Sequence, residues 1–253
     1  MNNPRFFSPQ PLSVGARVDL SESAARHAAR VLRLKEDDCL TLFDGAGGEY
    51  VARIARVGRD NMAVEVMQWS DVECESPIDI TLIQALQSGE KMDLTVQKAV
   101  ELGVRRIVPV ASQRSVVRLE GDRAQRRVAH WRAVAASACE QCGRNRVPEV
   151  SALEGLRPWL ARPASGGTLR LMLDPRSVNT LGSLPRPQTD SGIELLIGAE
   201  GGLSPDEMDL AVRAGFVGVR LGPRVLRTET AGLAALAAIQ CLWGDFRGEA
   251  DHV

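Results

Sequence analysis

Residues 193–207 read IELLIGAEGGLSPDE, and this stretch decides the fold of the second part of the chain. An apolar run, Ile193–Ile197, passes into a turn with three glycines, and Ser204-Pro205 then opens a helical pattern. Serine is a favoured N-cap and proline suits the first helical position, while Glu207 at the third position completes a capping box. A buried strand, a glycine-rich turn and a capped helix in this order are typical of a parallel α/β sheet.

The glycines of this turn allow a ligand to approach the backbone closely. Glycine has no Cβ, and the free amides of a helix N-terminus attract acceptor groups. The spacing matches neither G-x-x-x-x-G-K-[ST] nor G-x-G-x-x-G, so the sequence does not indicate a nucleoside-triphosphate or dinucleotide site. Taken alone, the pattern fits a tight strand-to-helix turn as well as it fits a binding loop.

Two further polar loops follow apolar runs. Residues 221–231 read LGPRVLRTETA, and residues 110–115 read VASQRS. Thr228 and Glu229 also fit an N-cap and a favourable charge at a helix start. Ligands of open parallel sheets bind at the loops beyond the carboxyl ends of the strands, so these three loops are the candidates for the site.

Strand and helix patterns alternate from Ile78 onward. This alternation predicts a mostly parallel sheet covered by helices on both faces. The expected strands are 78–86, 106–110, 169–173, 193–197 and 217–221. The expected helices are 92–102, 122–142, 153–160, 205–214 and about 229–243. Gly103 is expected to end the first of these helices.

The first seventy residues follow a different pattern. The expected strands are 40–43, 49–57 and 62–69, separated at hairpin spacing by 45–48 and 58–61. Ser21 is expected to cap a helix that reaches about Leu34. Its inward stripe would consist of Ala24, Ala25, Ala28, Val31 and Leu32. These features predict a small barrel-like module, with the polar segment 70–77 as the linker.

The composition describes a globular chain of 253 residues with one charge asymmetry. Hydrophobic residues make up 44% and charged residues 25%, which excludes a mainly disordered chain. Neither a membrane-length apolar run nor the apolar core of a signal peptide is present, so we expect a soluble, cytoplasmic protein. Between Gly103 and Arg146, ten arginines stand against three acidic residues, although the net charge of the chain is −1. This belt fits either a polyanion-binding surface or a solvated helix face.

The five cysteines do not predict a metal site. Their odd number, without a signal peptide, indicates reduced thiols. Cys139 and Cys142 form the one C-x-x-C pair, and His27, His130 and His252 are isolated in the sequence. Zinc would need two more ligands at matching spacing, so we expect these cysteines to pack and no metal to bind.

Together these motifs resemble the RsmE-type 16S ribosomal RNA uridine N3-methyltransferases of the SPOUT (trefoil-knot) superfamily. The most specific are IGAEGGLS at 197–204 and LGPRVLRTETA at 221–231. The resemblance spans nearly the whole chain, and one departure is Ala199, where the family usually has proline. The other matching segments are 5–7, His27, 30–33, 91–103, 113–115, 131–132 and 140–144.

The resemblance implies two domains, a PUA-like RNA-binding barrel at 1–72 and a SPOUT methyltransferase domain at 73–253. The second would be an α/β domain with a mostly parallel sheet and a deep trefoil knot, a rare exception among folds. The implied assembly is a homodimer with the site built across its interface, and the small residues of the last helix fit close helix packing. The implied partner is the 16S ribosomal RNA of the small ribosomal subunit, with no membrane and no metal.

The implied reaction moves a methyl group from S-adenosylmethionine to N3 of uridine 1498 in 16S ribosomal RNA. The N3 imide must lose its proton as or before it attacks, and positive charge near O2 and O4 would stabilise the uridine anion. Alignment of N3 with the methyl carbon would supply much of the rate. The base would have to leave its stack to be reached.

The resemblance implies three groups of site residues. The cofactor would contact Leu173, Gly198, Glu200, Gly201, Gly202, Leu221, Gly222, Leu226 and Thr228, largely through the backbone. The catalytic candidates are Arg114, Arg144, Arg227, Glu229, Glu140 and Lys91. The arginines would contact phosphate or uracil oxygens, and the glutamates would orient the arginines or accept a proton. The RNA-binding candidates are Arg5, His27, Arg30, Arg33, Arg118 and Arg126.

Two alternative functions and several simpler residue roles are compatible with the same sequence. A solvated lysine at position 91, a helix-start charge at 229 and a structural histidine at 27 need no site at all. An RNA-binding assembly factor without catalysis would use the barrel and the arginine belt alone. A related knotted methyltransferase acting on transfer RNA would share the loops. Cofactor binding separates the assembly factor from the enzymes, and the identity of the modified RNA separates the two enzymes.

Overall fold

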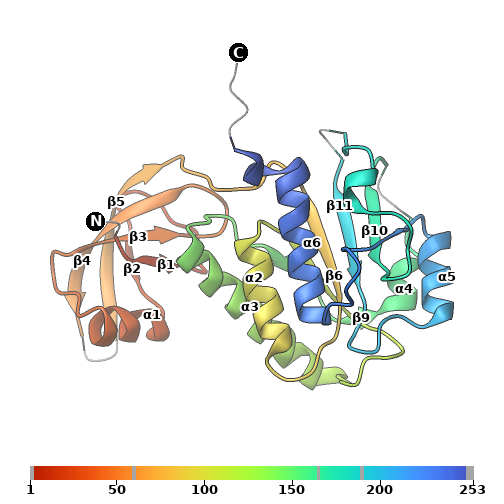
Figure 1. Ribbon diagram of the computed structural model, residues 1–253. Coiled ribbons are helices and arrows are strands. Elements are labelled where there is room, and N and C mark those ends of the chain that lie inside the picture. Colours follow the sequence, from red (N-terminus) through yellow and green to blue (C-terminus); the bar gives the residue numbers. More distant parts are fainter. Residues whose placement is uncertain (1–2, 59–60, 164–165, 189–190, 249–253) are drawn as a thin grey trace, which may run out of the picture. The chain divides into compact units, whose positions relative to one another are not determined.

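The computed structural model describes residues 3–58, 61–163, 166–188 and 191–248 (Figure 1). The chain divides into two compact units, each with its own sheet and hydrophobic core. The N-terminal unit takes residues up to 75 together with 136–147, and the C-terminal unit takes 76–135 together with the rest. His252 and the expected turn residues Arg59 and Asp60 lie outside the described residues. Within the described ranges, no helix is long and apolar enough to cross a bilayer.

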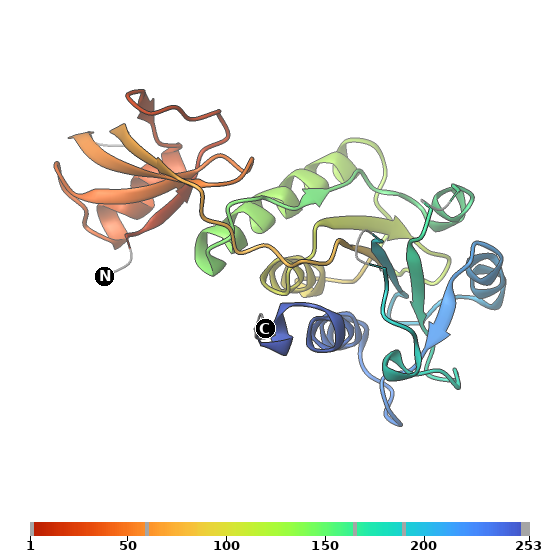
Figure 2. The same cartoon turned by 90° about the horizontal axis from the view of Figure 1, so that it is seen from above.

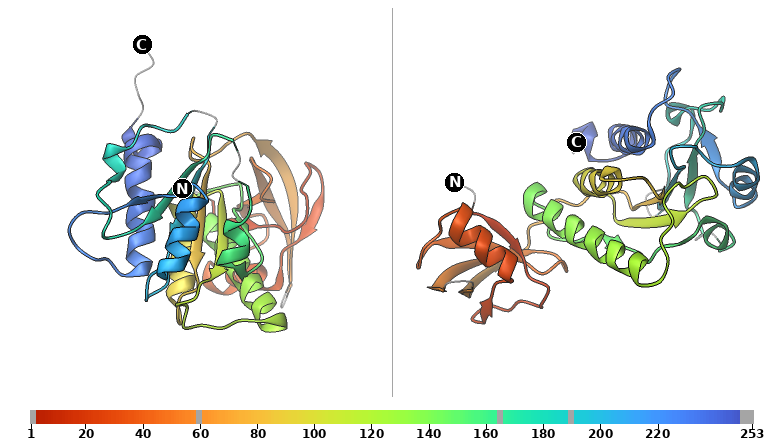
Figure 3. Two further views of the ribbon diagram at one scale, coloured as in Figure 1. Left: turned by 90° about the vertical axis from the view of Figure 1, so that its right-hand side faces the viewer. Right: turned by 90° about the horizontal axis from the view of Figure 1, so that it is seen from below.

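The N-terminal unit is built on a five-stranded sheet in the order β1-β3-β4-β5-β2. The strands are β1 (Arg5–Phe7), β2 (Arg17–Asp19), β3 (Cys39–Phe43), β4 (Glu49–Val57) and β5 (Met62–Ser70). The two predicted hairpins are confirmed, because β3, β4 and β5 pair antiparallel in sequence order. The pairing of β4 with β5 shifts register twice, and such bulges increase twist, so the sheet curls (Figure 3). The strands β1 and β2 were missed, since three residues are too few to show a period.

The helix of the N-terminal unit is shorter and less regular than the sequence predicts. Ser21 caps it as expected, since its side chain accepts a backbone N–H of the first turn. The helix α1 spans Glu22–Arg26 and continues as a π-helical turn, His27–Val31, so the predicted extension to Leu34 was wrong. A π turn holds more residues per turn and rotates the inward stripe. Val31 is therefore 67% exposed, although the three alanines of the stripe are buried.

The C-terminal unit contains the predicted parallel sheet. Its order is β12-β10-β11-β6-β7-β8, with β9 also paired to β7, and every pair is parallel. The strands are β6 (Ile80–Ala85), β7 (Arg106–Ala111), β8 (Glu149–Val150), β9 (Glu154–Gly155), β10 (Leu169–Leu173), β11 (Ile193–Ile197) and β12 (Val217–Val219). The five predicted strands are confirmed within about two residues. The strands β8 and β9 were not predicted because each has two residues.

Helices cover both faces of this sheet (Figures 2 and 3). The helices α2 (Lys91–Glu101) and α6 (Thr228–Trp243) lie side by side on one face. The helices α4 (Leu156–Leu160) and α5 (Pro205–Arg213) lie together on the other. The helix α3 (Gly121–Cys142) contributes its first part to this unit. Two short 3₁₀ turns, Leu181–Ser183 and Asp245–Arg247, complete the elements.

The ends of two helices follow the sequence prediction. Ser204 and Glu207 form the predicted capping box: the Ser204 N–H donates to the carboxylate at 2.9 Å, and the Glu207 N–H donates to the hydroxyl at 3.3 Å. Gly103 follows the last turn of α2 with φ +80°, a conformation that favours glycine.

The carboxyl ends of the parallel strands meet at one edge of the sheet. The loops that leave this edge are 86–90, 112–120, 174–180, 198–204 and 220–227. The three loops singled out in the sequence are among them. Open parallel sheets bind their ligands at this edge, so a ligand-binding site is expected here.

Candidate functional site

A cavity of about 390 Å³ opens at this edge between the loop after β11 and the loop before α6. We name it the glycine-loop cavity. Its volume falls within the roughly 300–1,000 Å³ of small-molecule sites. Six of the nine predicted cofactor contacts line it: Leu173, Gly198, Glu200, Gly202, Leu226 and Thr228. The other lining residues are Pro175, Ile197, Ala199, Leu203, Val225, Arg227 and Ala231.

Two glycines shape the wall of this cavity. A Cβ on Gly198 would lie 2.9 Å from the carbonyl carbon of Gly202, so a side chain there would push the loop open. Gly202 has φ +70°, which other residues adopt only with strain. Its N–H donates to the carbonyl oxygen of Ala199 at 2.8 Å and closes the turn. Glycine is thus required for the tight turn and at the same time exposes backbone groups to a ligand.

The remaining three predicted cofactor contacts, Gly201, Leu221 and Gly222, are not part of the cavity wall. Gly201 is backed by Arg114, and a Cβ on Gly201 would lie 3.3 Å from the Cβ of that arginine. Leu221 and Gly222 follow β12, where Gly222 turns the chain with φ +75°. Their contact with a cofactor stays a prediction.

Thr228 connects the cavity to the buried core. Its hydroxyl donates to the carbonyl oxygen of Gly198 at 2.6 Å and accepts from the amides of Gln84 and Gln87 at 3.3 and 3.4 Å. The hydroxyl of Thr95 donates in turn to Gln87 at 2.8 Å. These side chains are all buried, and their hydrogen bonds fix the glycine loop against the first turn of α6. The two glutamines were missed in the sequence, where polar residues at the end of an apolar strand pattern were the available signal.

One ammonium and two carboxylates lie beside the cavity. The Nζ atom of Lys91 is 3.7 Å from Glu200 and 3.4 Å from Glu229. Ser88, also missed in the sequence, donates to Glu200 from its N–H at 3.0 Å and from its hydroxyl at 2.8 Å. Burial raises the pKa of Glu200, but the Ser88 hydrogen bonds and the charge of Lys91 outweigh burial and lower this pKa below its usual value. Glu200 is therefore ionised at neutral pH.

Glu200 and Glu229 each have one carboxylate oxygen that accepts no hydrogen bond within the described residues. Their Oε2 atoms are buried and have no hydrogen-bond partner among the described residues. Such atoms are rare in folded proteins because the lost hydration costs free energy. Glu200 lines the cavity, but its unpartnered oxygen is buried, so a donor of a bound ligand reaches this atom only when the side chain turns. Arg227 also lines the cavity and stands directly before α6.

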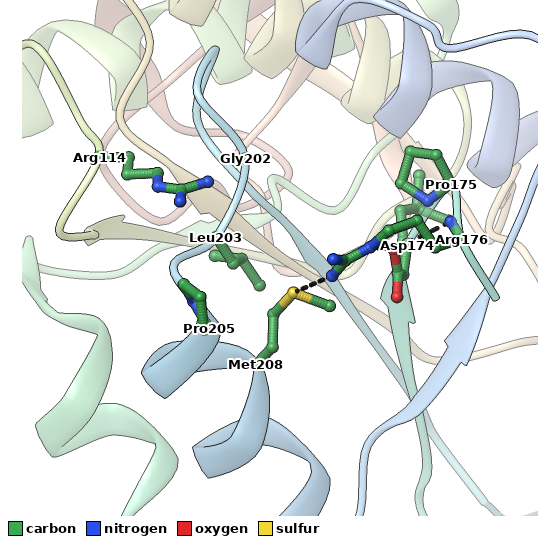
Figure 4. A pocket seen from close by; sticks show the side chains of 9 residues that line it. Arg114, Asp174, Pro175, Arg176, Gly202, Leu203, Pro205 and Met208 are labelled. Atoms are coloured by element: carbon green, nitrogen blue, oxygen red, sulfur yellow. Dashed lines mark hydrogen bonds and ion pairs between the residues drawn. The ribbon is translucent and has the colours of Figure 1, made fainter.

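A second cavity, of about 220 Å³ (Figure 4), shares part of its wall with the first. We name it the arginine cavity, because Arg114 and Arg176 approach it from opposite sides (Figure 4). Arg114 is anchored by its Nη1 atom, which donates to the carbonyl oxygen of Gly201 at 2.9 Å. The residues shared by both cavities are Leu173, Pro175, Gly202 and Leu203. Arg176 was missed in the sequence, although it follows a strand end in the run Asp174-Pro175-Arg176.

The predicted catalytic residues Arg144 and Glu140 belong to the N-terminal unit. Arg144 is buried and forks onto Glu75, with Nε at 2.9 Å from one oxygen and Nη2 at 2.5 Å from the other. Glu140 accepts the N–H of Phe7 at 2.9 Å. Burial raises the pKa of Glu140 above its usual value, although the Phe7 bond opposes the shift. The role of these two residues in a reaction stays a prediction.

Four of the predicted RNA contacts lie in the N-terminal unit. Arg5 pairs with Glu49 and donates to the side chain of Asn145 at 2.6 Å. His27 meets the ring of Phe6 edge-on, with the ring centroids 6.1 Å apart. Arg30 and Arg33 are exposed beside it.

The other two predicted RNA contacts, Arg118 and Arg126, belong to the C-terminal unit, where Arg126 is exposed. Arg126 lines a third cavity, of about 390 Å³, together with Arg123 and Arg127. Arg127 pairs with Asp93 at 3.8 Å and lies over the ring of Trp131. Three arginines of the belt between Gly103 and Arg146 thus line the same cavity.

The C-x-x-C pair is part of the packing of the N-terminal unit. Cys139 is buried, and burial raises the pKa of its thiol to about 12. A thiol that stays protonated is a poor nucleophile and a poor metal ligand. In the described parts of the chain, no cluster of histidine, cysteine and acidic residues is arranged to hold a metal ion.

Two known domains match this chain. The RNA methyltransferase domain matches residues 74–240, and the RNA methyltransferase PUA domain matches residues 20–67. These matches cover the parallel sheet with its three described cavities and most of the curled sheet. The fold and the site therefore define the class of protein as an RNA methyltransferase with a PUA domain.

Individual relatives narrow this class. A ribosomal RNA small subunit methyltransferase E from Buchnera aphidicola is 33% identical over 96% of this chain and 97% of its own. A solved structure of that enzyme from Neisseria gonorrhoeae, bound to S-adenosyl methionine, is 43% identical over 97% of this chain and all of its own, with a TM-score of 0.89. A putative methyltransferase from Legionella pneumophila, solved with bound SAM, is 35% identical over the same shares, with a TM-score of 0.90. The chain belongs to the ribosomal RNA small subunit methyltransferase E family.

Proposed function

We propose that this protein transfers the methyl group of S-adenosylmethionine to N3 of uridine 1498 in the 16S ribosomal RNA of the small subunit. The observation that carries the proposal is the glycine-loop cavity. It is formed by the two motifs most specific to the family, in a chain 43% identical to a relative solved with this cofactor. The proposal extends the family's small-subunit RNA methylation to one base and one atom.

The residues of the glycine-loop cavity fit S-adenosylmethionine. Leu173, Leu203 and Leu226 offer an apolar wall for a flat base, and the glycines offer backbone acceptors and donors. The buried, unpartnered carboxylate oxygen of Glu200 can accept from a hydroxyl or an amino group once its side chain turns toward the cavity. When bound, S-adenosylmethionine supplies a methyl group activated by a positively charged sulfur. We include Gly201, Leu221 and Gly222 among its contacts.

The charged residues beside the cavity orient the site. Lys91 draws Glu200 and Glu229 together, so the loop after β11 and the first turn of α6 are held at one point. Arg114 and Arg227 supply positive charge for phosphate or uracil oxygens. Such charge lowers the free energy of the uridine anion that forms as N3 loses its proton. A glutamate or a water molecule accepts that proton.

We retain Arg144 and Glu140 as site residues, but the contact of Arg144 with RNA needs a change in its ion pairing. Arg144 is buried against Glu75, so its contact with RNA requires that this ion pair opens. Opening a buried pair leaves an uncompensated charge and costs several kcal/mol unless phosphate replaces the carboxylate. A phosphate of an RNA duplex, or a group of the partner subunit in a homodimer, can take the place of the Glu75 carboxylate.

The proposal also covers the organisation of the protein. Residues 1–72 bind RNA through Arg5, His27, Arg30 and Arg33, and residues 73–253 carry the knotted methyltransferase domain. Arg118 and Arg126 add contacts to the RNA backbone. Two chains pair through α6, whose small residues permit close packing. The protein acts in the cytoplasm on the small ribosomal subunit.

A transfer assay tests this function. Purified protein and radiolabelled S-adenosylmethionine are incubated with small subunits from cells that lack the endogenous activity, and in parallel with naked 16S RNA and with transfer RNA. We expect label at a single N3-methyluridine. No label in any RNA together with no binding of the cofactor would favour the assembly factor without catalysis. Label in transfer RNA instead would favour the related enzyme.

A further inference from the structure

The arginine cavity contains a cation that neither the sequence motifs nor the cofactor fit accounts for. Arg176 follows β10 closely, and its side chain is 76% exposed. Its Nε lies 3.3 Å from a carboxylate oxygen of Asp174, which also accepts the Arg176 N–H at 3.0 Å. Its Nη2 donates to the sulfur of Met208, at 3.1 Å (Figure 4). A thioether is a weak acceptor, so the outer end of the guanidinium keeps most of its capacity to bind an anion.

Arg114 supplies a second cation on the opposite side. Figure 4 shows its guanidinium across the cavity from that of Arg176, near Gly202. One of its terminal nitrogens is occupied by the carbonyl oxygen of Gly201 at 2.9 Å, which anchors the side chain and lets the other terminal nitrogen turn toward a ligand. Among the residues that line the cavity, two carry guanidinium groups and one, Asp174, carries a carboxylate. Such a surplus of positive charge favours an anion.

The rest of the wall is apolar and the space is small. Leu173, Leu203 and Pro205 face a volume of about 220 Å³, below the roughly 300 Å³ at which drug-sized ligands begin. A single flat ring fits this description better than a whole nucleotide or a phosphate chain. The cavity also shares wall residues with the glycine-loop cavity, so its occupant lies next to the cofactor.

We propose that the arginine cavity holds the uracil ring of the target nucleotide, with Arg176 and Arg114 each donating to one of its two carbonyl oxygens. The proposal rests on the proposed function. O2 and O4 stand on either side of N3, so cations on opposite walls bind both oxygens and leave N3 between them. All three atoms belong to the pairing edge of the base, which becomes accessible only once the base has left its stack.

This arrangement accounts for the chemical step. The N3 proton passes to water, and the resulting negative charge spreads over O2 and O4, where the two guanidinium groups stabilise it. The lone pair of N3 then forms the bond to the methyl carbon, while the electron pair of the carbon–sulfur bond stays with sulfur. The uracil becomes neutral again. Asp174 is a positioning residue, because it holds Nε of Arg176 and keeps its outer nitrogens turned into the cavity.

The variants that test the proposal are Arg176→Ala and Arg176→Lys, with Arg157→Ala as the matched control. Arg157 is also an exposed arginine with a carboxylate partner, Asp206 at 3.3 Å, but it lines neither cavity. Single-turnover methylation of small subunits is measured across neutral and mildly alkaline pH, and the cofactor Kd is measured by calorimetry. A second substrate contains 5-fluorouridine at the target position, since fluorine makes the N3–H more acidic.

We expect Arg176→Ala to slow single-turnover methylation by roughly 100-fold at neutral pH, because one donor to a developing anion is lost. The cofactor Kd should stay within about threefold of wild type. The deficit should shrink as pH rises and again with 5-fluorouridine, because both supply the anion without the arginine. Arg176→Lys should recover part of the rate, and Arg157→Ala should match wild type.

Each contrary result has its own meaning. A rate equal to wild type would overturn the role of Arg176. A cofactor Kd weakened by the same factor as the rate would place Arg176 on the carboxylate of the cofactor instead of the uracil. A deficit that is constant with pH and unchanged by 5-fluorouridine would show a merely structural role. If wild type itself placed no methyl group on N3, the proposed function would fail first and this proposal with it.

Discussion

Two of the cavities at the carboxyl edge of the parallel sheet, the glycine-loop cavity and the arginine cavity, are built in opposite ways. The glycine-loop cavity is shaped by backbone and by buried neutral side chains, from Gly198 to Thr228 and Gln87. The arginine cavity has two exposed arginines on an otherwise mostly apolar wall, with Arg176 held by one carboxylate and a sulfur. The glycine-loop cavity is therefore fixed before any ligand binds, whereas the arginine cavity is completed by its ligand.

This difference suits the two substrates of the proposed reaction. A small cofactor binds best to a rigid pocket, because no ordering cost is left for the binding step. A base that must leave an RNA structure arrives tethered to a large partner, and long cationic side chains can adjust to it. Changes in one cavity should therefore affect cofactor affinity, and changes in the other should affect the rate of transfer.

Replacing Arg114 should damage catalysis while leaving cofactor binding intact. Arg114→Ala removes a guanidinium from the arginine cavity, so the rate of methyl transfer should fall by about 100-fold to 1,000-fold. The cofactor Kd should remain within about threefold of wild type. Single-turnover assays and calorimetry measure the two quantities. Arg162→Ala, an exposed arginine paired with Glu154, is the control and should behave as wild type. An equal loss in rate and in cofactor affinity would contradict the division between the cavities.

Adding one methyl group at Gly198 should have the opposite effect and should weaken cofactor binding. The new Cβ would lie 2.9 Å from the backbone of Gly202, so Gly198→Ala must widen the loop or strain it. Overpacking of this kind costs about 1–3 kcal/mol, which corresponds to a cofactor Kd weakened by roughly 5-fold to 150-fold. Gly182→Ala provides the control, because nothing lies within 4 Å of its added Cβ. Unchanged cofactor affinity in Gly198→Ala would show that the loop is not a rigid wall.

Removing the hydroxyl of Thr228 should destabilise the buried hydrogen bonds that support the wall of the glycine-loop cavity. Thr228→Val leaves the carbonyl oxygen of Gly198 and the amides of two glutamines without their shared partner. Unsatisfied buried groups cost about 1–3 kcal/mol, and urea unfolding should report a loss of this size in the free energy of unfolding. The neighbouring exposed Thr230→Val should change it by less than about 0.5 kcal/mol. Equal effects at both positions would argue against the buried network.

The smallest effect concerns Glu200 and pH. Its pKa is lowered in the folded state, so the folded protein binds a proton here less readily than the unfolded chain does. The carboxylate therefore adds stability above its usual pKa, and this contribution is lost as pH falls through the lowered pKa. The difference in unfolding free energy between wild type and Glu200→Gln should narrow as pH falls from neutral into the acid range. Parallel stability curves over this range would show that Ser88 and Lys91 do not favour the ionised form.

The sequence was sufficient for the features that depend on neighbouring residues. The alternating patterns placed the main strands of the parallel sheet, and the spacing of Ser204 and Glu207 predicted a capping box that the structure contains. The motif loops supplied most of the predicted cofactor contacts that line the glycine-loop cavity. The strands and the capping box follow from local backbone preferences, which a short window of sequence contains, whereas the cofactor contacts came from the resemblance to the family.

Features that depend on distant partners were not accessible in this way. Arg144 looked like Arg114, an arginine in a polar segment, yet it is buried against a carboxylate 69 positions away. Ser88 and Gln87 gained their importance from contacts with the loop after β11 and with α6. Arg176 owes its significance to Arg114, a residue 62 positions earlier that lines the same cavity. Burial and long-range pairing are properties of the folded chain, and no local pattern encodes them.

The most direct test of the two-cavity account is the structure of the protein on the small ribosomal subunit with an unreactive analogue of S-adenosylmethionine, determined by electron cryomicroscopy. We predict the analogue in the glycine-loop cavity and one uridine of 16S RNA turned out of its stack into the arginine cavity. Its O2 and O4 should each lie within hydrogen-bond distance of Arg114 or Arg176. An analogue bound elsewhere, or a uridine held outside the arginine cavity, would contradict the account.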